Sequence, residues 1–597
     1  MAARVRKTGS NSAFLRALAD RSSDPAGRTW VYLPYDQLSQ DLPVLAGRAP
    51  EELGIVFVEN PEKASRRPYH KQKLALVLAN GRQFLLEQAA RGVAIDFRVA
   101  RAGYARELRA AAQAHGPLLC AEPAERELRH ELKGLFAEGA LLARPAGGFL
   151  TSREEFRESQ RRPDGGHRPP WRLDAFYRHV RSARGWLLED GRPKGGKWSL
   201  DAENREPWRG HPPAPKPLRF APDPISAEVG ELIEQRFAEH PGRLDLAALP
   251  TTLADARAQW EWTKREALPH FGPYEDAFSL DQPVLFHSLL SPLLNLSRLL
   301  PAALLEELLA LDLPLQSQEG FLRQVLGWRE FVRHVHLETD GFRSLPPGFA
   351  GDHLGAKQPL PAAFWPGAPS GLACLDGVVE QVWDSGYSHH ITRLMVLGNI
   401  ATLLGVSPRE LCDWFWIAYI DAWDWVVEPN VLAMATYATS EMTTKPYVSG
   451  SAYLEKMGDS CRTCRFTPGK DCPIGPLYWA FLARNDGVLA DNPRMKLPLA
   501  SARGRTDDVR AREAQTFVAL RDVLINGKRW EGGSVADVKS AHAPERGTKS
   551  ANSPIKTSAK SSAKSSAKSS ATTPSLFPRE EPRNPNAQST GRARRNP

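Results

Sequence analysis

Residues 28–38 read RTWVYLPYDQL, and three later runs share this short apolar pattern: LGIVFVEN (53–60), VAIDFRVA (93–100) and PLLCAEP (117–123). Runs of this length, rich in β-branched and aromatic residues, predict β-strands. The segments between them space their apolar residues as helices do, over 70–92, 102–116 and 124–140. Strands that alternate with helices predict a parallel sheet with crossover helices, so we expect a Rossmann-like α/β domain over residues 28–148.

The rest of the chain divides by its composition. Residues 1–27 are basic and show no periodic pattern, so we expect a flexible N-terminal extension. Residues 149–224 are rich in Arg, Pro, Gly and Trp and predict an interdomain connector. Residues 225–530 show helical spacing almost throughout, which predicts a large all-α C-terminal domain. Residues 531–597 contain the repeat SAKSSAKSSAKSSA, which has nothing to bury and predicts a disordered basic tail.

The net charge of +9 over 597 residues is concentrated at the two ends of the chain. Residues 541–597 hold 11 basic and 3 acidic residues, and residues 1–27 hold 5 basic and 2 acidic ones. The part between them therefore carries a net charge of about −2. A basic chain suggests nucleic-acid binding, but a folded body of this charge can bind DNA only through a local basic patch.

No apolar run reaches the roughly 18–20 residues that span a bilayer. The richest stretch, residues 288–313, is interrupted by Arg298, Glu306 and Glu307. The first residues have no apolar core before a small-residue cleavage site, so they do not resemble a secretory signal. We therefore expect a cytoplasmic protein without a membrane span.

Three of the six cysteines form the motif CRTCRFTPGKDCP, in which Cys461, Cys464 and Cys472 have the spacing C-x2-C-x7-C. Three local thiolates leave one position open, and Cys374, which opens a helical segment, is the best candidate for the fourth ligand. Four thiolates can bind zinc or an iron–sulfur cluster. The trailing Pro473 favours the cluster, while zinc and unrelated free thiols remain the alternatives.

Five segments of the helical half occur in an order that resembles one family. They are FHSLLSPLLNLSRL (286–299), RQVLGWREFVRHV (323–335), GYSHHITRLMVLGNIATLLG (386–405), DAWDWVVEPNVLAMATYA (421–438) and TTKPYVSGSAYLEKMGDSCRTCR (443–465). They resemble the iron–sulfur bacterial cryptochrome and photolyase group, the prokaryotic (6-4) photolyases. The resemblance covers about residues 28–530.

The resemblance implies three bound groups and a reaction. The helical domain would hold FAD and a [4Fe-4S] cluster, and the α/β domain would hold a ribityl-lumazine antenna. A monomeric enzyme of this group acts on UV-damaged DNA as a photolyase, a carbon–carbon lyase. The reduced FAD, excited by blue light, donates an electron to a flipped-out (6-4) pyrimidine–pyrimidone lesion, and the electron returns after the bond rearranges.

The resemblance also implies which residues contact the flavin. The phosphate-binding segment would be Ser288, Leu289, Leu290 and Ser291, at a helix start where hydroxyls and free N–H groups suit a pyrophosphate. The other expected contacts are Trp328, Arg329, Arg393, Asn399, Asp421 and Asn430. Without the family, an ordinary capped helix and a core Trp with a surface ion pair explain these residues equally well.

Three residues are expected at the lesion: His389, His390 and Tyr447. Movement of the lesion's hydroxyl group between the two bases needs a proton, which histidine can deliver near neutral pH. In the resembling family the second histidine faces the lesion, so His390 is the expected general acid. A lone helix histidine is otherwise more often a structural residue.

Trp365 and Trp414 match residues that carry electrons from the surface to the flavin during photoreduction. The position after Trp414 is usually oxidisable in the family but is Phe415 here. A second departure lies in DAWDWVVEPN, where Val427 replaces the usual Glu and a Glu follows at position 428. We expect Trp416 or another nearby tryptophan to replace Phe415 as carrier. We expect Glu428 to compensate for Val427 by a one-residue shift.

The antenna is expected at Tyr35, Asp36, Gln37 and Leu38, where the first strand ends and a helix should begin. The carboxyl edge of a parallel sheet is the usual ligand edge. No G-x-G-x-x-G fingerprint follows the first strand, so an NAD site is not predicted.

Two other functions compete with repair. A cryptochrome-type blue-light photoreceptor would carry the same FAD and cluster but would not restore damaged DNA. A non-photochemical iron–sulfur module that binds nucleic acid would contain no flavin.

Overall fold

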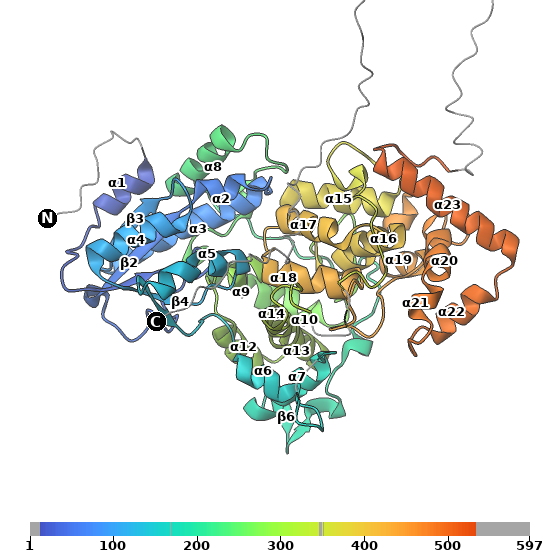
Figure 1. The fold of residues 1–597 in the computed structure, drawn as a ribbon, viewed down its shortest axis with the longest axis horizontal. Coiled ribbons are helices and arrows are strands. Elements are labelled where there is room, and N and C mark those ends of the chain that lie inside the picture. The colour runs from blue at the N-terminus through green and yellow to red at the C-terminus, as the bar shows by residue number, and fades with distance from the viewer. Residues whose placement is uncertain (1–11, 167–168, 346–348, 350, 533–597) are drawn as a thin grey trace, which may run out of the picture. The chain divides into compact units, whose positions relative to one another are not determined.

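The computed structural model describes residues 12–166, 169–345, 349 and 351–532. Five parallel strands form one sheet in the order β3-β2-β1-β4-β5 (Figure 1). Their bounds are β1 Thr29–Tyr32, β2 Leu53–Glu59, β3 Ala94–Val99, β4 Leu118–Ala121 and β5 Leu141–Arg144. The four predicted strands and the Rossmann-like parallel order are confirmed. β5 was not predicted, because only its first residue is buried and the strand has no apolar alternation.

Alternate residues of the central strands face opposite sides of the sheet, as the strand period of two requires. Val31 and Ile55 belong to the main hydrophobic core, whereas Trp30 and Val56 belong to a second cluster. The helix α3 (Lys71–Ala90) covers the first side, and α4 (Tyr104–His115) and α5 (Arg126–Ala137) contribute to the second.

All regular elements described between residues 225 and 530 are helical, as predicted. The α-helices run from α8 to α23: Pro224–Arg236, Leu253–Trp262, Leu268–Phe271, Ser291–Asn295, Pro301–Ala310, Leu315–Leu322, Glu330–Glu338, Ala373–Ser385, Asn399–Leu404, Pro408–Ala418, Asp424–Glu428, Ser451–Met457, Ile474–Arg484, Asp486–Leu489, Lys496–Arg503 and Asp507–Ile525. Four π-helical segments interrupt this series: η5 Thr263–Ala267, η6 Arg323–Arg329, η8 Thr392–Gly398 and η9 Pro429–Ala435.

The prediction that residues 1–27 are flexible is wrong for residues 13–19. This segment forms α1 (Ala13–Ala19), which Ser12 caps by accepting a hydrogen bond from the Leu15 backbone N–H at 3.1 Å. Phe14 is buried and meets the Phe97 ring edge-on, with centroids 5.0 Å apart. Phe14 is the one buried residue among the seven of this helix, so the sequence carried no clear periodic signal. Residues 1–11 of the predicted extension lie outside the described residues.

The connector, residues 149–224, is more ordered than its composition indicated. It contains α6 (Arg153–Ser159), α7 (Leu173–Arg184) and a short hairpin of β6 (Leu188–Glu189) and β7 (Arg192–Pro193), drawn at the lower edge of Figure 1. Thr151 N–H and hydroxyl both donate to the buried carboxylate of Glu330, at 3.0 and 2.8 Å. The connector therefore packs against the helical domain as part of its structure.

The α/β part and the helical part share one core. Val31 of β1 and Trp414 of α17 belong to the same buried cluster, and the His70 backbone N–H donates to the Ile417 carbonyl at 2.9 Å. Near the boundary predicted at residue 530, Trp530 is buried and its N–H donates to the Ser370 carbonyl at 2.8 Å. The predicted tail lies outside the described residues from 533 onward. Among the helices described, none is long and apolar enough to cross a membrane.

Candidate functional site

Three of the four π-helical segments carry predicted flavin residues. Trp328 and Arg329 lie in η6, Arg393 in η8 and Asn430 in η9. A π-turn inserts one residue into a helix and re-aims the side chains around it, and such turns are frequent at functional sites. These interruptions therefore mark the region independently of the sequence motifs.

Asp421 is the centre of a buried polar network. Its carboxylate accepts hydrogen bonds from both Arg393 Nη atoms at 3.0 Å and from the Ser291 hydroxyl at 2.6 Å. The Asn295 side-chain amide donates to the Asp421 carbonyl at 2.9 Å. The Arg393 guanidinium also lies over the Tyr419 ring, 4.0 Å from its centroid. The structure thus brings together Ser291, Arg393 and Asp421, three residues far apart in the sequence.

The segment expected to bind phosphates forms a tight loop before a short helix. Leu289 has φ of 58°, a left-handed conformation that a leucine adopts at a cost of about 1–3 kcal/mol. The Ser288 carbonyl is held by the Gln259 side-chain amide at 3.1 Å and the Thr263 hydroxyl at 3.0 Å. The following helix, α11, has only five residues and no side-chain cap. Its start is therefore a weaker phosphate-binding site than the regular helix N-terminus that we expected. Leu290 is buried in the main core.

The other predicted flavin residues have structural partners. Asn430 donates to the Val426 carbonyl at 2.8 Å, and Asn399 exchanges two hydrogen bonds with Ser449 at 3.0 Å. Arg329 donates to Glu330 at 3.0 Å, and burial lowers the pKa of this arginine to about 10. The Trp328 ring packs edge-on against Phe331 at 6.5 Å. These contacts fit the structural interpretation, and none of them joins the Asp421 network.

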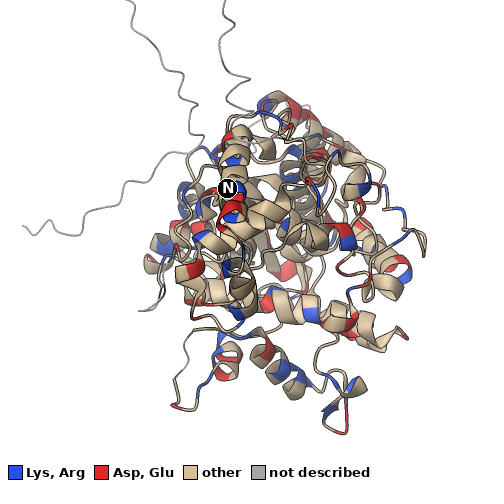
Figure 2. Ribbon diagram, turned by 90° about the vertical axis from the view of Figure 1, so that its right-hand side faces the viewer, with Lys and Arg blue, Asp and Glu red and all other residues tan. Residues whose placement is uncertain are grey.

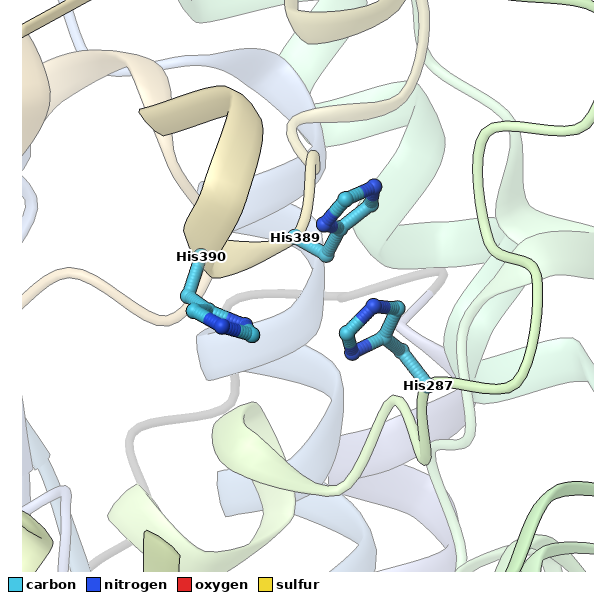
Figure 3. A group of neighbouring side chains, drawn as sticks. All are labelled: His287, His389 and His390. Atoms are coloured by element: carbon cyan, nitrogen blue, oxygen red, sulfur yellow. The ribbon is translucent and has the colours of Figure 1, made fainter. Parts of the chain in front are cut away.

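Three imidazoles meet beside this network (Figure 3). The His287 and His389 rings stack with centroids 4.2 Å apart, and His390 meets His287 edge-on at 5.4 Å. Burial, together with repulsion within the cluster, holds the pKa of His287 and His389 well below the usual value, so both are neutral near pH 7. Within the described residues, both ring nitrogens of His389 and Nε2 of His287 have no hydrogen-bond partner. The sequence motif did not indicate His287.

The nitrogen atoms of these three histidines lie within 4.8 Å of one another, which is close enough to consider a metal ion. Imidazole lone pairs lie in the ring plane, however, and the planes of His287 and His389 are nearly parallel, at 10°. An ion between the rings would sit out of both planes. The cluster as it stands is therefore a poor site for a metal ion between these two rings.

His390 is the exposed member of the cluster, with 41% of its side chain accessible. Its Nε2 lies 3.6 Å from Asp276, whose other oxygen lies 3.8 Å from Arg205 Nε. Tyr447 is half-buried, and burial is the main cause of its raised pKa. Arg494 and Arg205 lower this pKa electrostatically, which indicates that Tyr447 lies near Arg205. The predicted lesion residues thus lie in one region.

The four predicted cysteine ligands come together. All are free thiols, and burial raises the pKa of Cys374, with further increases from Cys472, Cys461 and Cys464. In the part of the chain that the structure describes, no three of these sulfurs fall within 4.8 Å of one another.

The predicted electron carriers lie in one aromatic cluster but do not touch. Trp365 stacks on Trp383 with centroids 5.5 Å apart, and Trp383 meets Trp414 at 5.9 Å and 87°. Phe415 packs edge-on against Trp414 at 5.2 Å and stacks on Tyr419 at 5.3 Å. The sequence motifs did not identify Trp383.

A family model described as "Deoxyribodipyrimidine photo-lyase-related protein" matches residues 31–248. The (6-4) photolyase of Agrobacterium fabrum is 33% identical over 503 residues, which cover 80% of this chain and 95% of the relative. The chain belongs to the photolyase/cryptochrome family. A bacterial class III photolyase from Agrobacterium tumefaciens, of known structure, covers 84% of this chain and 99% of its own, with 16% identity and a TM-score of 0.48. A Synechocystis cryptochrome structure covers 80% and 98%, with 14% identity and a TM-score of 0.49.

Membership in the photolyase/cryptochrome family implies a flavin cofactor and DNA as the partner. The residues around Asp421 fit this cofactor. Hydrogen bonds from Ser291 and Asn295 hold Asp421 in place to pair with the Arg393 guanidinium. The neighbouring His287 and His389 have buried ring nitrogens without hydrogen-bond partners among the described residues, and these could bond to a ligand. Buried polar atoms without partners are costly unless a ligand satisfies them.

The second departure from the expected motif has a structural outcome. Glu428 does not replace the missing Glu at position 427, because it points to an ion cluster formed with His336 at 3.0 Å, Arg343 at 2.7 Å and Arg409 at 3.0 Å. Both positions lie in the helix α18, where a shift of one residue turns the side chain by about 100°. The expected compensation is therefore wrong, and Val427 is part of the core.

The expected antenna segment contributes one residue to a pocket wall. In the described chain, no helix begins at residues 35–38. This segment instead contacts the helical domain, because the Leu38 N–H donates a hydrogen bond to the Leu296 carbonyl at 2.9 Å. A pocket with about 100 Å³ of free volume lies at the carboxyl edge of the sheet, and Tyr35 lines it. Asp36, Gln37 and Leu38 are buried and are not among its lining residues.

Proposed function

We propose that this protein repairs (6-4) pyrimidine–pyrimidone photoproducts in DNA, using light and a reduced FAD. The observation that carries the proposal is the half-exposed His390 at the edge of a buried group of neutral imidazoles, beside the Asp421–Arg393 pair. The name of the Agrobacterium fabrum relative, (6-4) photolyase, supports this choice of lesion.

The chain's own residues would hold the flavin from two sides. Arg393, Asp421 and Ser291 would form the charged side, and the segment with the left-handed turn at Leu289, which leads directly to Ser291, would form the other. When bound, FAD supplies the light-driven electron that starts the repair. Because Arg393 is held at both Nη atoms by Asp421, its position is fixed before the cofactor binds.

His390 would deliver the proton that moves the lesion's hydroxyl group. Its side chain is 41% accessible, and its Nε2 lies 3.6 Å from Asp276. The stacked His389 and His287 limit where the His390 ring can turn. Tyr447 would contact the lesion from the other side of Arg205.

A basic group near Tyr447 would bind DNA phosphates. Lys445, Arg494 and Arg205 are close enough that the two arginines lower the pKa of the lysine, in addition to the effect of its burial. Phosphate contacts of this kind position DNA and are blind to sequence. Figure 2 shows Lys and Arg interspersed with Asp and Glu on the face in view, so a local group rather than a wholly basic face would bind DNA.

We propose a [4Fe-4S] cluster on Cys374, Cys461, Cys464 and Cys472. The influence of Cys472, Cys461 and Cys464 on the pKa of Cys374, together with Pro473 after the third cysteine, supports this proposal. Six free thiols also suit a reducing compartment such as the cytoplasm.

The pocket at the sheet edge would hold the ribityl-lumazine antenna. Tyr35, Tyr69, Trp416 and Trp423 give it aromatic walls, which suit a planar heterocycle. Lys73 lines the same pocket, and burial lowers its pKa to about 7. Its ammonium group donates to the Trp416 carbonyl at 2.7 Å and to the Ala422 carbonyl.

A repair assay tests the proposal. The purified full-length protein with reduced flavin is mixed with duplexes that carry one (6-4) photoproduct or one cyclobutane dimer, and each is kept dark or lit with blue light. We expect restored thymines only in the lit (6-4) sample. Light-dependent flavin reduction without repair would instead support the blue-light photoreceptor, and a spectrum without flavin bands would support a non-photochemical iron–sulfur module.

A further inference from the structure

We propose that Trp383 is the middle member of an electron-transfer row, Trp414–Trp383–Trp365, that reduces the flavin from the protein surface. The proposal rests on the flavin-binding part of the proposed function. It assigns a redox role to a residue that the sequence motifs left aside.

The ring contacts define the row. Trp414 meets Trp383 edge-to-face at 5.9 Å, and Trp383 stacks on Trp365 at 5.5 Å with ring planes only 17° apart. Rings in van der Waals contact are coupled strongly enough for fast electron hopping. No ring contact joins Trp365 directly to Trp414 among the described residues, so the row is interrupted without Trp383.

The inner end of the row reaches the Asp421 network. Trp414 meets Tyr419 at 6.1 Å, and Arg393 lies over the Tyr419 ring. Tyrosine must lose its proton when it is oxidised, but the Tyr419 hydroxyl pairs at 2.9 Å with the Ser388 hydroxyl, which is not a base. Burial raises the pKa of Tyr419 further, so the positive hole is more stable on a tryptophan.

The outer end of the row reaches solvent. Trp414 is fully buried and Trp383 nearly so, at 0% and 6% exposure, whereas Trp365 is half-buried. The indole N–H groups of both buried tryptophans donate to the same carbonyl, that of Phe364, at 3.0 and 2.9 Å. A carbonyl accepts a hydrogen bond but not a proton at neutral pH. Oxidised Trp383 therefore keeps its proton and passes the hole outward.

His70 supports this role by remaining neutral. Its ring lies parallel to that of Trp383, 2° apart in orientation, with centroids 5.8 Å apart. Burial lowers the pKa of His70 to about 4, so it places no positive charge beside an oxidised Trp383 near pH 7. The stacked His70 ring thus does not oppose a cation on Trp383.

Phe415 explains why the chain needs this residue. It occupies the position after Trp414 that is oxidisable in the resembling family, and phenylalanine cannot carry a hole at accessible potentials. Among the described residues, the Phe415 ring contacts Trp414 at 5.2 Å and otherwise stacks on Tyr419. Trp383 gives Trp414 a different oxidisable neighbour, on the side that leads to solvent.

The electrons balance in single steps. Trp414 loses one electron to the light-excited oxidised flavin, Trp383 reduces Trp414, and Trp365 reduces Trp383. The Trp365 cation loses its indole proton to water, and a thiol in solution reduces the resulting neutral radical. The thiol is oxidised, and the flavin retains one electron.

Photoreduction in the holoprotein is the first test. In Trp383→Phe, light-driven flavin reduction with a thiol donor should drop to the level of Trp414→Phe. The matched control is Trp260→Phe, since Trp260 is buried but packs against Phe321 outside the row. Photoreduction of Trp383→Phe at the wild-type rate would overturn the proposal.

The second test leaves Trp383 unchanged, so it does not depend on whether the Trp383→Phe variant folds. In Trp365→Phe, which alters a half-buried loop residue, the hole should stop at Trp383. Pulsed EPR measures the distance between the light-induced flavin and tryptophan radicals. In Trp365→Phe this distance should be shorter than in wild type and longer than in Trp383→Phe. If Trp383→Phe does not fold, the distance in Trp365→Phe should still be longer than that of a radical pair held at Trp414. A hole located on Trp414 in Trp365→Phe would refute the role of Trp383.

Repair with chemically reduced flavin separates this proposal from the proposed function. Reduced flavin bypasses the row, so Trp383→Phe should repair (6-4) lesions at the wild-type rate after dithionite treatment. Loss of repair under these conditions in Trp383→Phe would show a structural role and contradict the redox assignment. Absence of repair in the wild-type protein would instead count against the proposed function alone.

Discussion

His390 and His389 are neighbours in sequence but differ in environment. His389 is buried and neutral, with both ring nitrogens unpartnered within the described residues, whereas His390 is exposed and lies beside Asp276. The same residue type therefore has two different environments one position apart. Burial suits His389 for shaping the site, and exposure suits His390 for proton transfer.

Replacing His390 by Ala should abolish (6-4) repair and leave FAD bound, because the imidazole supplies the proton but does not join the Asp421 network. Repair yield per absorbed photon and the flavin absorption spectrum measure the two effects. His179→Ala changes a histidine of similar side-chain exposure, 37%, and is the control. Undiminished repair in His390→Ala would rule out its acid role.

Asp36 predicts a pH dependence of stability. Its carboxylate is buried without a side-chain hydrogen-bond partner among the described residues. Burial, followed by the negative charge of Glu125, raises the pKa of Asp36 from 3.8 to about 7. Lys63 lowers this pKa and Asp424 raises it slightly further. The folded state thus binds more protons, and Asp36 lowers stability as pH rises from about 4 to 7. Each pKa unit is worth about 1.4 kcal/mol, so the whole effect is at most about 4 kcal/mol.

Asp36→Asn should remove this effect: the variant should be more stable than wild type at pH 7 and no more stable near pH 4. Denaturant unfolding between these values measures the difference. Lys73, with its lowered pKa of about 7, acts in the opposite direction but above this range, and it cancels in the comparison of the two proteins. Parallel pH profiles for wild type and variant would contradict the interpretation.

At the scale of elements, the π-helical segments separate site from scaffold. The segment η6 lies between α13 and α14, η8 precedes α16 and η9 follows α18, and each contains a predicted flavin residue. Only the η8 residue, Arg393, joins the charged network. The sequence motifs therefore predict the three segments that surround the site, but they do not predict which of the side chains joins the Asp421 network.

The loop with Cys461, Cys464 and Cys472 meets the start of α15, which supplies Cys374. Cys461→Ser should lose iron, because a serine hydroxyl is a weaker ligand than a thiolate, and should lower thermal stability. Iron and sulfide content measure the first effect. Cys412→Ala is the control, because the raised pKa of the Cys412 thiol comes from burial, Glu428 and Asp413 rather than from the other cysteines. Full iron content in Cys461→Ser, or zinc in the wild type, would refute the cluster.

At the scale of the whole molecule, the basic charge and the proposed chemistry lie in different parts. Residues 541–597 carry a net charge of about +8, while residues 28–540 are close to neutral. Lys and Arg attract DNA phosphates independently of sequence and in a salt-dependent way. The tail would thus act on encounter with DNA rather than on the lesion.

Removal of residues 541–597 should weaken binding to undamaged DNA and make it less sensitive to salt. The log–log slope of affinity against salt should fall by about 0.9 for each phosphate that the tail neutralises in the full-length protein. Repair at saturating DNA should not change. Titration of labelled duplex at several salt concentrations measures the slope. A tail of equal length with Gln in place of Lys and Arg separates charge from length, and an unchanged slope in both variants would show that the tail does not bind DNA.

The sequence by itself determined the parallel sheet, the helical half, the family and the cysteine motif, because each is written in a local pattern or an ordered set of motifs. It did not reveal α1, β5 or the packed connector, whose few buried residues gain their partners only from distant segments. Only the tertiary structure joined Asp421 to Arg393 and Ser291, added His287 to the histidine pair and turned Glu428 away from the site. It also placed Trp383 between Trp365 and Trp414. These are contacts between residues far apart in the chain, and no local pattern encodes which side chains meet when helices pack.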